Sequence, residues 1–267
     1  METSDWQRQT KEKVLFPELL WSRPQNNRQA GKLLIIGGSQ QNFSSVAETY
    51  NQAAKAGIGS TRVLLPQSLQ KAIGNFLPEA VFAPTTSSGG FASASIAELL
   101  EEASWADGVI LAGNLGNNSQ TAIAIESFVA KYDGPLIISG DSVELIMPSA
   151  KTIIARPSTT LVLGFSQLQR LLTASNYKTA VTSNLDLMQI VNILHDFTKA
   201  NSVNIVTQFA ANIVTAADGK ISTTKLLESE ISIVPVTAFA AVWLIQNPTK
   251  AFEAITTAAA ALLENNK

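Results

Sequence analysis

The stretch KLLIIGG at residues 32–38 joins a short apolar run to a glycine pair. A run of this kind predicts a central strand covered on both faces, and the glycines predict a tight turn into a helix. VILAGNLG at 109–116 and PLIISGD at 135–141 repeat this arrangement. Three such units in one chain indicate an α/β fold with a mainly parallel sheet.

Other segments extend the alternation of strands and helices. We expect strands at 33–36, 61–65, 80–82, 109–112, 136–139 and 152–155. Helices are expected between most of them, most clearly at 45–56, 95–103, 119–131 and 160–172. This alternation predicts right-handed crossovers, which place helices on both faces of the sheet.

The pattern changes after residue 184. A helix is expected at 185–199, short strands at 204–207, 212–215 and 220–223, and closing helices at 236–246 and 248–263. Asp218-Gly219 predicts a hairpin turn, so we expect an antiparallel edge on the parallel sheet. Pro248 is expected in the first turn of the last helix.

Composition excludes several functions. The 19 basic and 21 acidic side chains are scattered, so no basic stripe is available for nucleic acid. The chain has no cysteine and a single histidine, His195, so we expect no metal site. No apolar run approaches the roughly 18 residues of a membrane span. We therefore expect no membrane partner and a cytoplasmic protein.

We expect one domain over residues 1–267. The chain shows no linker, repeat or low-complexity segment, and its length suits one large α/β domain. Residues 1–30 are expected to form an N-terminal helical extension packed on that domain. The charges in this extension stand where a signal peptide would need an apolar run.

Ligands of open parallel sheets bind beyond the carboxyl ends of the strands. The amides of residues 37–39 precede a helix and are candidates for anion binding, although a tight turn also explains these glycines. The loop at 113–116 allows close backbone approach to a ligand. Asp141 stands three residues before Glu144, which predicts an N-cap, but its carboxylate could also accept hydrogen bonds from ligand hydroxyls. Glu228 and Glu230 lie just before the penultimate helix, where loop solvation explains them most simply.

In order, these segments resemble the ribokinase-like family of ADP/ATP-dependent NAD(P)H-hydrate dehydratases, which repair hydrated nicotinamide cofactors. Residues 37–59 keep the family's Gly-Gly-Ser and its later Ala-Gly-x-Gly without a gap. AGNLG at 112–116 stands for Gly-Pro-Gly-Leu-Gly, and SGDSVEL at 139–145 keeps an aspartate as Asp141. The resemblance covers nearly the whole chain and implies a ribokinase-like three-layer α/β/α fold.

The resemblance also implies ligands and partners. ADP or ATP is the implied nucleotide, with Mg²⁺ as a further candidate, and hydrated NAD(P)H is the implied substrate. We expect a small-molecule nucleotide or dinucleotide ligand and a homo-oligomer. The residues implied in binding are Gly38, Ser39, Ser45, Gly113, Asn114, Gly116, Asp141, Arg156 and Gln208.

The departures from the family fall on polar groups. IARPST at 154–159 stands for Thr-Pro-His-Pro-x-Glu, so Arg156 replaces the histidine and Thr159 the glutamate. Gln208-Phe209 replaces the nucleotide-binding Lys-Gly. VPVT at 234–237 replaces Gly-Thr-Gly-Asp, so Thr237 stands in place of the catalytic aspartate. Proline lacks the N–H that an anion hole needs, and threonine is a poor general base at neutral pH.

Three functions stay open. The first is a lyase of this family with weak or lost catalysis, whose rewired site would need Asp141 or Glu230 as the acid. The second is a non-catalytic pseudoenzyme that binds a nucleotide or cofactor, or serves as an oligomeric scaffold. The third is a ribokinase-like small-molecule kinase, which needs a similar glycine-rich aspartate motif and so is weakened equally.

Overall fold

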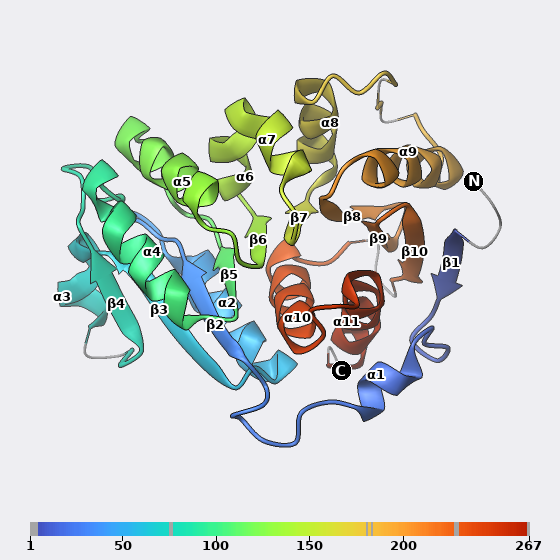
Figure 1. Cartoon of the computed structure of the whole chain (residues 1–267), viewed down its shortest axis with the longest axis horizontal. Coiled ribbons are helices and arrows are strands. Elements are labelled where there is room, and N and C mark those ends of the chain that lie inside the picture. Colours follow the sequence, from blue (N-terminus) through green and yellow to red (C-terminus); the bar gives the residue numbers. More distant parts are fainter. Residues whose placement is uncertain (1–4, 75–76, 180, 183, 227–229, 266–267) are drawn as a thin grey trace.

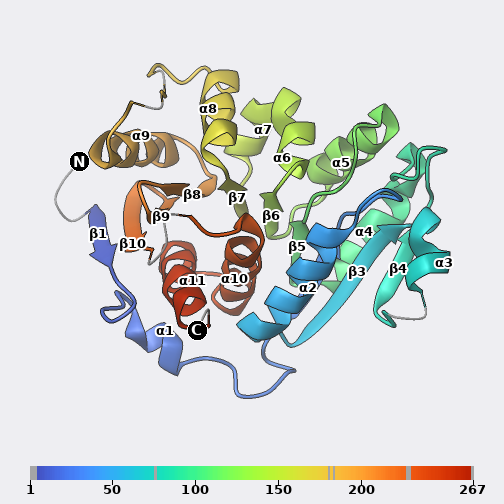
Figure 2. The same ribbon diagram turned by 180° about the vertical axis from the view of Figure 1, so that it is seen from behind.

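A computed structural model describes residues 5–74, 77–179, 181–182, 184–226 and 230–265. Within them, ten strands form one sheet in the order β1-β10-β9-β8-β7-β6-β5-β2-β3-β4. Helices cover both faces of this sheet (Figure 1, Figure 2). The predicted α/β/α arrangement with a mainly parallel sheet is therefore confirmed.

The middle of the sheet is parallel, as the apolar runs predict. Its strands are β2 (Lys32–Ile36), β3 (Ser60–Pro66), β4 (Ala80–Ala83), β5 (Gly108–Leu111), β6 (Leu136–Ser139), β7 (Thr159–Leu163) and β8 (Asn204–Phe209). The side chains of Leu33 to Ile36 are fully buried. Burial of this kind on both faces is the physical reason why β2, β5 and β6 are almost continuously apolar instead of alternating.

The antiparallel edge follows the parallel strands. β9 (Asn212–Ala217) pairs with β8 and with β10 (Lys220–Lys225), both antiparallel. Asp218 and Gly219 close the second hairpin with positive φ angles of 50° and 73°. A two-residue turn with two positive φ angles matches the twist of the strands, so the predicted hairpin is confirmed.

Two helical layers enclose the sheet. One layer holds α4 (Ile96–Trp105), α5 (Ser119–Lys131), α6 (Ser142–Ile146), α7 (Ala150–Ala155), α8 (Phe165–Ala174) and α9 (Leu187–Ala200). The other holds α1 (Pro17–Trp21), α2 (Ser44–Ala56), α10 (Ile233–Gln246) and α11 (Ala251–Asn265). The short α3 (Gln70–Ile73) follows β3. Each layer packs its own apolar cluster against one face of the sheet.

Two of the predicted boundaries around β7 are wrong. Residues 152–155 lie in helix α7, and the strand is formed by 159–163, the start of the range predicted as a helix. Gly164, with extended backbone angles, separates β7 from α8. Because a short apolar run fits a strand and a buried helix equally well, the sequence pattern alone could not separate them.

The two C-terminal helices also differ from expectation. Helix α10 begins at Ile233, three residues earlier than predicted, so residues 234–237 lie inside it. Helix α11 begins at Ala251, and Pro248 lies in the turn before it. In that turn the amide of Lys250 donates to the carbonyl of Asn247.

The N-terminal extension adds a strand as well as a helix. β1 (Trp6–Gln9) pairs in parallel with β10 at the edge of the sheet, and only α1 is helical in the described part of the extension. The buried Gln9 amide donates to Thr224 Oγ1 at 2.7 Å and to the carbonyl of Thr256 at 2.6 Å. The side chain of Gln9 therefore ties β1 to β10 and to α11.

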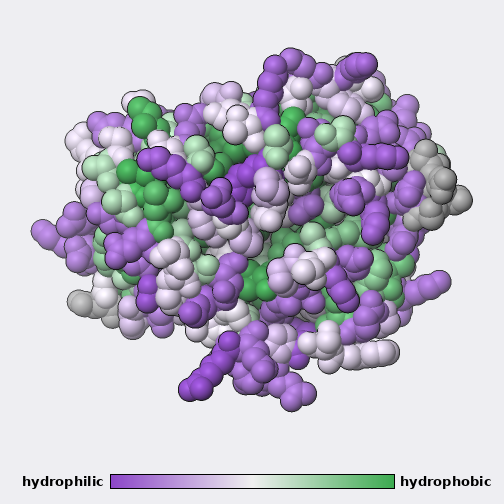
Figure 3. Space-filling model, viewed as in Figure 1, coloured by the Kyte–Doolittle hydropathy of each residue, from purple (hydrophilic) through white to green (hydrophobic). Residues whose placement is uncertain are grey.

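The largest exposed apolar side chains, where the structure describes them, lie on separate segments. They are Trp21, Phe43, Ile123 and Met188. On the face drawn in Figure 3, hydrophilic and hydrophobic residues are interspersed. Scattered apolar residues are ordinary on a protein surface, so they give the expected homo-oligomer no support.

Close backbone contact holds the loops after β2 and β5 together. The amide of Gly38 donates to the carbonyl of Gly113 at 2.9 Å. A Cβ atom on Gly37 would lie 2.6 Å from that same carbonyl oxygen and 2.8 Å from Val46 Cγ2. Glycine at position 37 is therefore required by space.

Replacing Gln9 with alanine should destabilise the protein. The change leaves the buried Thr224 hydroxyl and Thr256 carbonyl without this donor, which costs about 1–3 kcal/mol. Urea unfolding of Gln9→Ala and of the control Gln7→Ala measures the difference. Equal stability of the two variants would contradict the anchoring role of Gln9.

Replacing Gly37 with alanine should also lower the free energy of unfolding. The added methyl group must displace backbone or Val46, at a cost of about 1–3 kcal/mol. Gly164→Ala is the matched control, because φ is −69° there and the nearest atom to a new Cβ is 3.9 Å away. We expect thermal unfolding to show a loss below about 1 kcal/mol for the control. A stable Gly37→Ala protein would argue against the close packing of the two loops.

Candidate functional site

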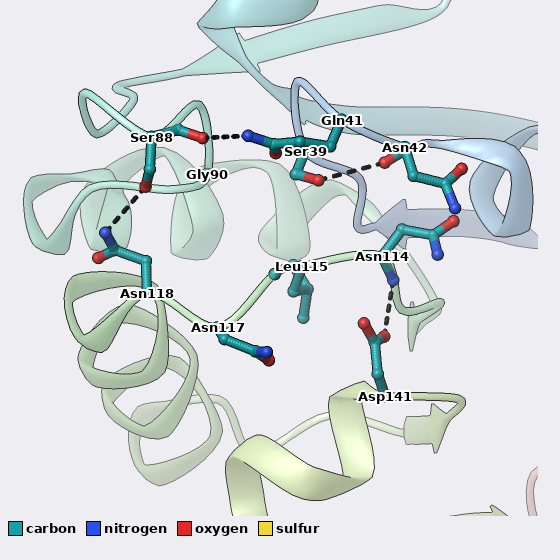
Figure 4. A pocket seen from close by; sticks show the side chains of 11 residues that line it. Ser39, Gln41, Asn42, Ser88, Gly90, Asn114, Leu115, Asn117, Asn118 and Asp141 are labelled. Carbon is teal, nitrogen blue, oxygen red and sulfur yellow. Dashed lines mark hydrogen bonds between the residues drawn. The ribbon is translucent and has the colours of Figure 1, made fainter.

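A polar cavity of about 470 Å³ lies at the carboxyl edge of the parallel strands. The loops that follow β2, β4, β5 and β6 form its walls (Figure 4). Its lining residues are Ser39, Gln41, Asn42, Ser88, Gly90, Asn114, Leu115, Gly116, Asn117, Asn118 and Asp141. We call it the amide-lined pocket. It brings together four predicted site residues, Ser39, Asn114, Gly116 and Asp141.

The amides of the first loop are used within the protein. Gly38 donates to Gly113, as described above. Ser39 donates its amide to the carbonyl of Asn42 at 2.8 Å, and Gln40 to that of Gly89 at 2.9 Å. The N–H groups that were predicted to bind an anion therefore donate to carbonyls of the chain itself. The glycines allow the two loops to pack closely.

Amide side chains cap the two helices that begin at this pocket. Asn114 Oδ1 accepts from the amide of Ser45 at 2.8 Å, and Asn42 Oδ1 accepts from that of Ser44 at 2.9 Å, both at the start of α2. At the start of α5, Asn118 Oδ1 accepts from the amide of Gln120 at 2.8 Å. First-turn N–H groups can bind an anion when they are open, but here neutral side chains engage three of them.

Asp141 reaches across to the neighbouring loop. Asp141 is the N-cap residue of α6, as predicted, but its side chain makes no capping bond there. Its Oδ1 accepts from the amide of Asn114 at 2.7 Å instead (Figure 4). A Cβ on Gly113, whose φ is 90°, would lie 2.6 Å from that oxygen. Glu144 forms an ion pair with Arg170 instead of completing a capping box. The exposed Asp141 carboxylate therefore belongs to the pocket.

Gln208 lies in a second cavity, at the start of α10. Its Nε2 donates to the carbonyl of Ile231 at 2.7 Å, and its Oε1 accepts from the amide of Ile231 at 2.9 Å. Glu230 lines the same cavity, whereas Glu228 lies outside the described residues. The amide of Gln208 is therefore committed to the loop before α10, in the position where the resemblance places a lysine.

Thr237 is fully buried in helix α10. Its Oγ1 donates to the carbonyl of Ile233, one turn earlier, at 2.8 Å. Pro235 is buried in the first turn, where its missing N–H costs no intrahelical bond. The amide of Val234 is paired with the N-cap Ser232 Oγ at 3.4 Å. Residues 234–237 thus form ordinary helix and do not open toward a ligand.

Arg156 lies just before β7, at the amino ends of the parallel strands and so on the side away from the amide-lined pocket. Its guanidinium donates to Thr159 Oγ1 and to the carbonyls of Pro157, Tyr132 and Gly134. Burial lowers the pKa of Arg156 and raises the pKa of Tyr132 to about 12. The structure therefore does not bring Arg156 to the other predicted binding residues, and Thr159 is a buried strand residue.

Sequence reasoning missed several residues that shape the site. Gln41 donates to the carbonyl of Ser88, and Asn118 donates to Ser88 Oγ, each at 2.9 Å. Gln167 bridges two loops by accepting from the amide of Gly164 and donating to the carbonyl of Gly140. In the sequence, Asn and Gln residues cluster next to the glycine loops, and this cluster could have indicated the polar lining of the pocket.

No group of three or more His, Cys, Asp or Glu suited to a metal ion occurs among the described residues. In the same residues, none of the helices combines the length and apolar character that crossing a lipid bilayer requires. His195 is buried, and its Nδ1 contacts the carbonyl of Gly219, so it supports the β9–β10 turn.

Comparison with known sequences finds no matching family model. The bifunctional NAD(P)H-hydrate repair enzyme Nnr of Methanothermobacter thermautotrophicus is 31% identical over 121 residues. The match covers 43% of this chain and 23% of that enzyme, so the chain matches about a quarter of its relative's length.

Comparison of structures covers far more of the chain. A ribokinase-like superfamily protein of Enterococcus faecalis shares 16% identity at a TM-score of 0.70, over 98% of this chain and 88% of its own. The ADP/ATP-dependent NAD(P)H-hydrate dehydratase of Bacillus subtilis, co-crystallised with ATP/Mg²⁺, shares 13% identity at a TM-score of 0.59, over 87% and 78%. The chain therefore has a ribokinase-like fold and is similar to the NAD(P)H-hydrate dehydratases, as the order of its motifs predicts.

Proposed function

We propose that this chain is an NAD(P)H-hydrate dehydratase-like protein that binds a small molecule in the amide-lined pocket and has weak or lost dehydratase activity. The observation that carries the proposal is the state of Thr237. The resemblance puts it in place of the acid/base aspartate, and its side chain is fully buried and donates its hydroxyl to the carbonyl of Ile233 in the same helix. Loss of such a group typically lowers a rate by about 10²–10⁴-fold.

The residues at the start of α10 do not fit the phosphates of ADP or ATP. A phosphate site at a helix N-terminus needs open N–H groups, but Pro235 has none and Val234 is paired with Ser232. Gln208, in place of the lysine, is neutral and bonded to Ile231 at both ends of its amide. We therefore assign no nucleotide-dependent step to this chain.

The same observations count against the kinase alternative. Phosphoryl transfer depends on groups that hold and neutralise the transferred phosphate. At the positions that would supply them, the amide of Gln208 is bonded to Ile231 and Thr237 is buried and bonded within its helix. A lyase ancestry with a changed site is the simpler account of the retained loops.

The wild-type protein should show little or no turnover of hydrated NADH with ADP or ATP and Mg²⁺. The return of NADH absorbance measures the reaction, with an active dehydratase assayed in parallel as the positive control. Turnover by the wild-type chain at a rate near that of the control would overturn the proposal.

Replacing Thr237 with aspartate should not restore activity. The carboxylate would be buried without a partner, which costs about 3 kcal/mol or more and lowers the melting temperature. Thr237→Ser keeps the hydroxyl and is the matched control, with a melting temperature expected near that of the wild type. A stable Thr237→Asp protein that dehydrates hydrated NADH would show that the site is open.

A further inference from the structure

We infer that copies of this protein associate head-to-tail, with Trp21 of one copy seated in a groove between helices α5 and α7 of the next copy. This interaction goes beyond the proposed function and needs no ligand or reaction. An exposed apolar side chain is by itself ordinary on a protein surface. The inference rests instead on a match between Trp21 and the groove in shape, aromatic contact and charge.

Trp21 differs from the other large apolar side chains at the described surface. It is 81% exposed, whereas Phe43, Ile123 and Met188 are between 37% and 53% exposed. It is the last residue of α1, and the buried Leu19 holds this helix against the apolar cluster of α10 and α11. The helix is therefore fixed on the molecule while its indole stands in solvent. A tryptophan buries about 150–250 Å² when it is covered, so a partner that covers Trp21 gains a large apolar contact.

The other three tryptophans of the chain each have a guanidinium over the ring. The pairs, with the distance from the guanidinium carbon to the ring centre, are Arg8–Trp6 at 4.1 Å, Arg62–Trp105 at 4.2 Å and Arg23–Trp243 at 5.1 Å. In the part of the chain that the structure describes, no cation lies over the ring of Trp21. Because the negative face of an indole attracts a cation, a second copy can supply the contact that Trp21 lacks.

A groove of about 620 Å³ lies between α5 and α7, and we call it the α5–α7 groove. Val129, Ile146 and Ile153 are buried and give it an apolar floor, while Ala130 and Ala155 leave its walls low. A concave apolar site of this kind suits a flat ring. Helix α1 packs on one face of the sheet and α5 and α7 on the other (Figure 1, Figure 2). Trp21 therefore cannot reach the groove of its own chain.

The polar groups of the α5–α7 groove also suit an indole. Arg156 lines the groove, and the hydrogen bonds described above fix its guanidinium in place. Among the described residues no carboxylate forms an ion pair with Arg156, so its charge is available to an aromatic face. The carboxylates of Glu126 and Asp133 line the same groove. Either can accept from the indole N–H, which usually finds a partner when it is buried.

Charges around the two surfaces complement each other. Glu18 is exposed on α1, three residues before Trp21 and so close to it on the helix. Lys131 of α5 and Lys151 of α7 are exposed next to residues that line the groove. None of these three charges is in an ion pair within the described chain. With Trp21 in the groove, Glu18 would face this basic rim, which favours the correct orientation of the two copies.

The geometry makes the contact heterologous. Each copy offers Trp21 and the groove at different places, so the contact passes from one copy to the next. One tryptophan and one helical turn cover less than the roughly 1,200 Å² of a stable interface. We therefore expect weak association, with a dissociation constant of about 10⁻⁵–10⁻⁴ M.

Sedimentation velocity of the full-length protein, from about 1 μM to about 1 mM, tests the inference. The sedimentation coefficient of the wild type should rise with concentration. Trp21→Ala, which removes the indole, and Ala130→Arg, which fills the groove, should stay monomeric. Met188→Ala and Ala97→Arg make the matched changes at exposed positions of α9 and α4, and both should associate as the wild type does. A wild type that stays monomeric at about 1 mM, or a Trp21→Ala protein that associates as well as the wild type, would overturn the inference.

An equimolar mixture of Trp21→Ala and Ala130→Arg tests the head-to-tail geometry. The first variant keeps the groove and the second keeps the indole, so the mixture should form a dimer that cannot grow further. Association in the mixture would also show that both variants are folded. Thermal unfolding of each variant alone provides the same check independently. A mixture of two folded variants that stays monomeric, or that forms assemblies larger than a dimer, would contradict the pairing of Trp21 with the α5–α7 groove.

Discussion

Backbone N–H groups at the start of a helix need acceptors, and in this protein the chain supplies several of them itself. The strand-to-helix loops of an open α/β sheet usually leave such groups to a ligand. Here the side chains of Asn42, Asn114 and Asn118 accept from them, and Asp141 accepts from the loop after β5. These contacts occupy N–H groups at the pocket that an anion would otherwise use.

At the start of α10, too, the chain leaves few N–H groups for a ligand, and here helix packing is the cause. The helix begins at Ile233, and its residues from Pro235 to Trp243 are buried between the sheet and the neighbouring helices. An apolar helix of this kind cannot shift to expose one position without uncovering many others. Thr237 is therefore held in the interior, and the double hydrogen bond from Gln208 fixes the loop that leads into the helix.

The sequence predicts those parts of the fold and site that depend on local pattern. The buried strands β2, β5 and β6 are continuous apolar runs, which periodicity detects. Strand β1 reads WQRQ, has no apolar pattern, and forms because β10 offers an unpaired edge. Asp141 and Asn114 were candidates from the resemblance, but their partners could not be predicted. Asn114 bonds Ser45 and Asp141 across 69 and 27 positions of the chain, and only the folded sheet brings these loops together.

The central claim is that the polar groups beside the cavity at the start of α10 are engaged within the chain and do not hold the phosphates of a nucleotide. The most direct measurement is a crystal structure of the protein soaked with ADP and Mg²⁺ at high concentration. We predict no nucleotide density beside residues 232–236, with Thr237 Oγ1 still bonded to the carbonyl of Ile233. Ordered phosphates on the amides at the start of α10, with Gln208 released from Ile231, would contradict the account.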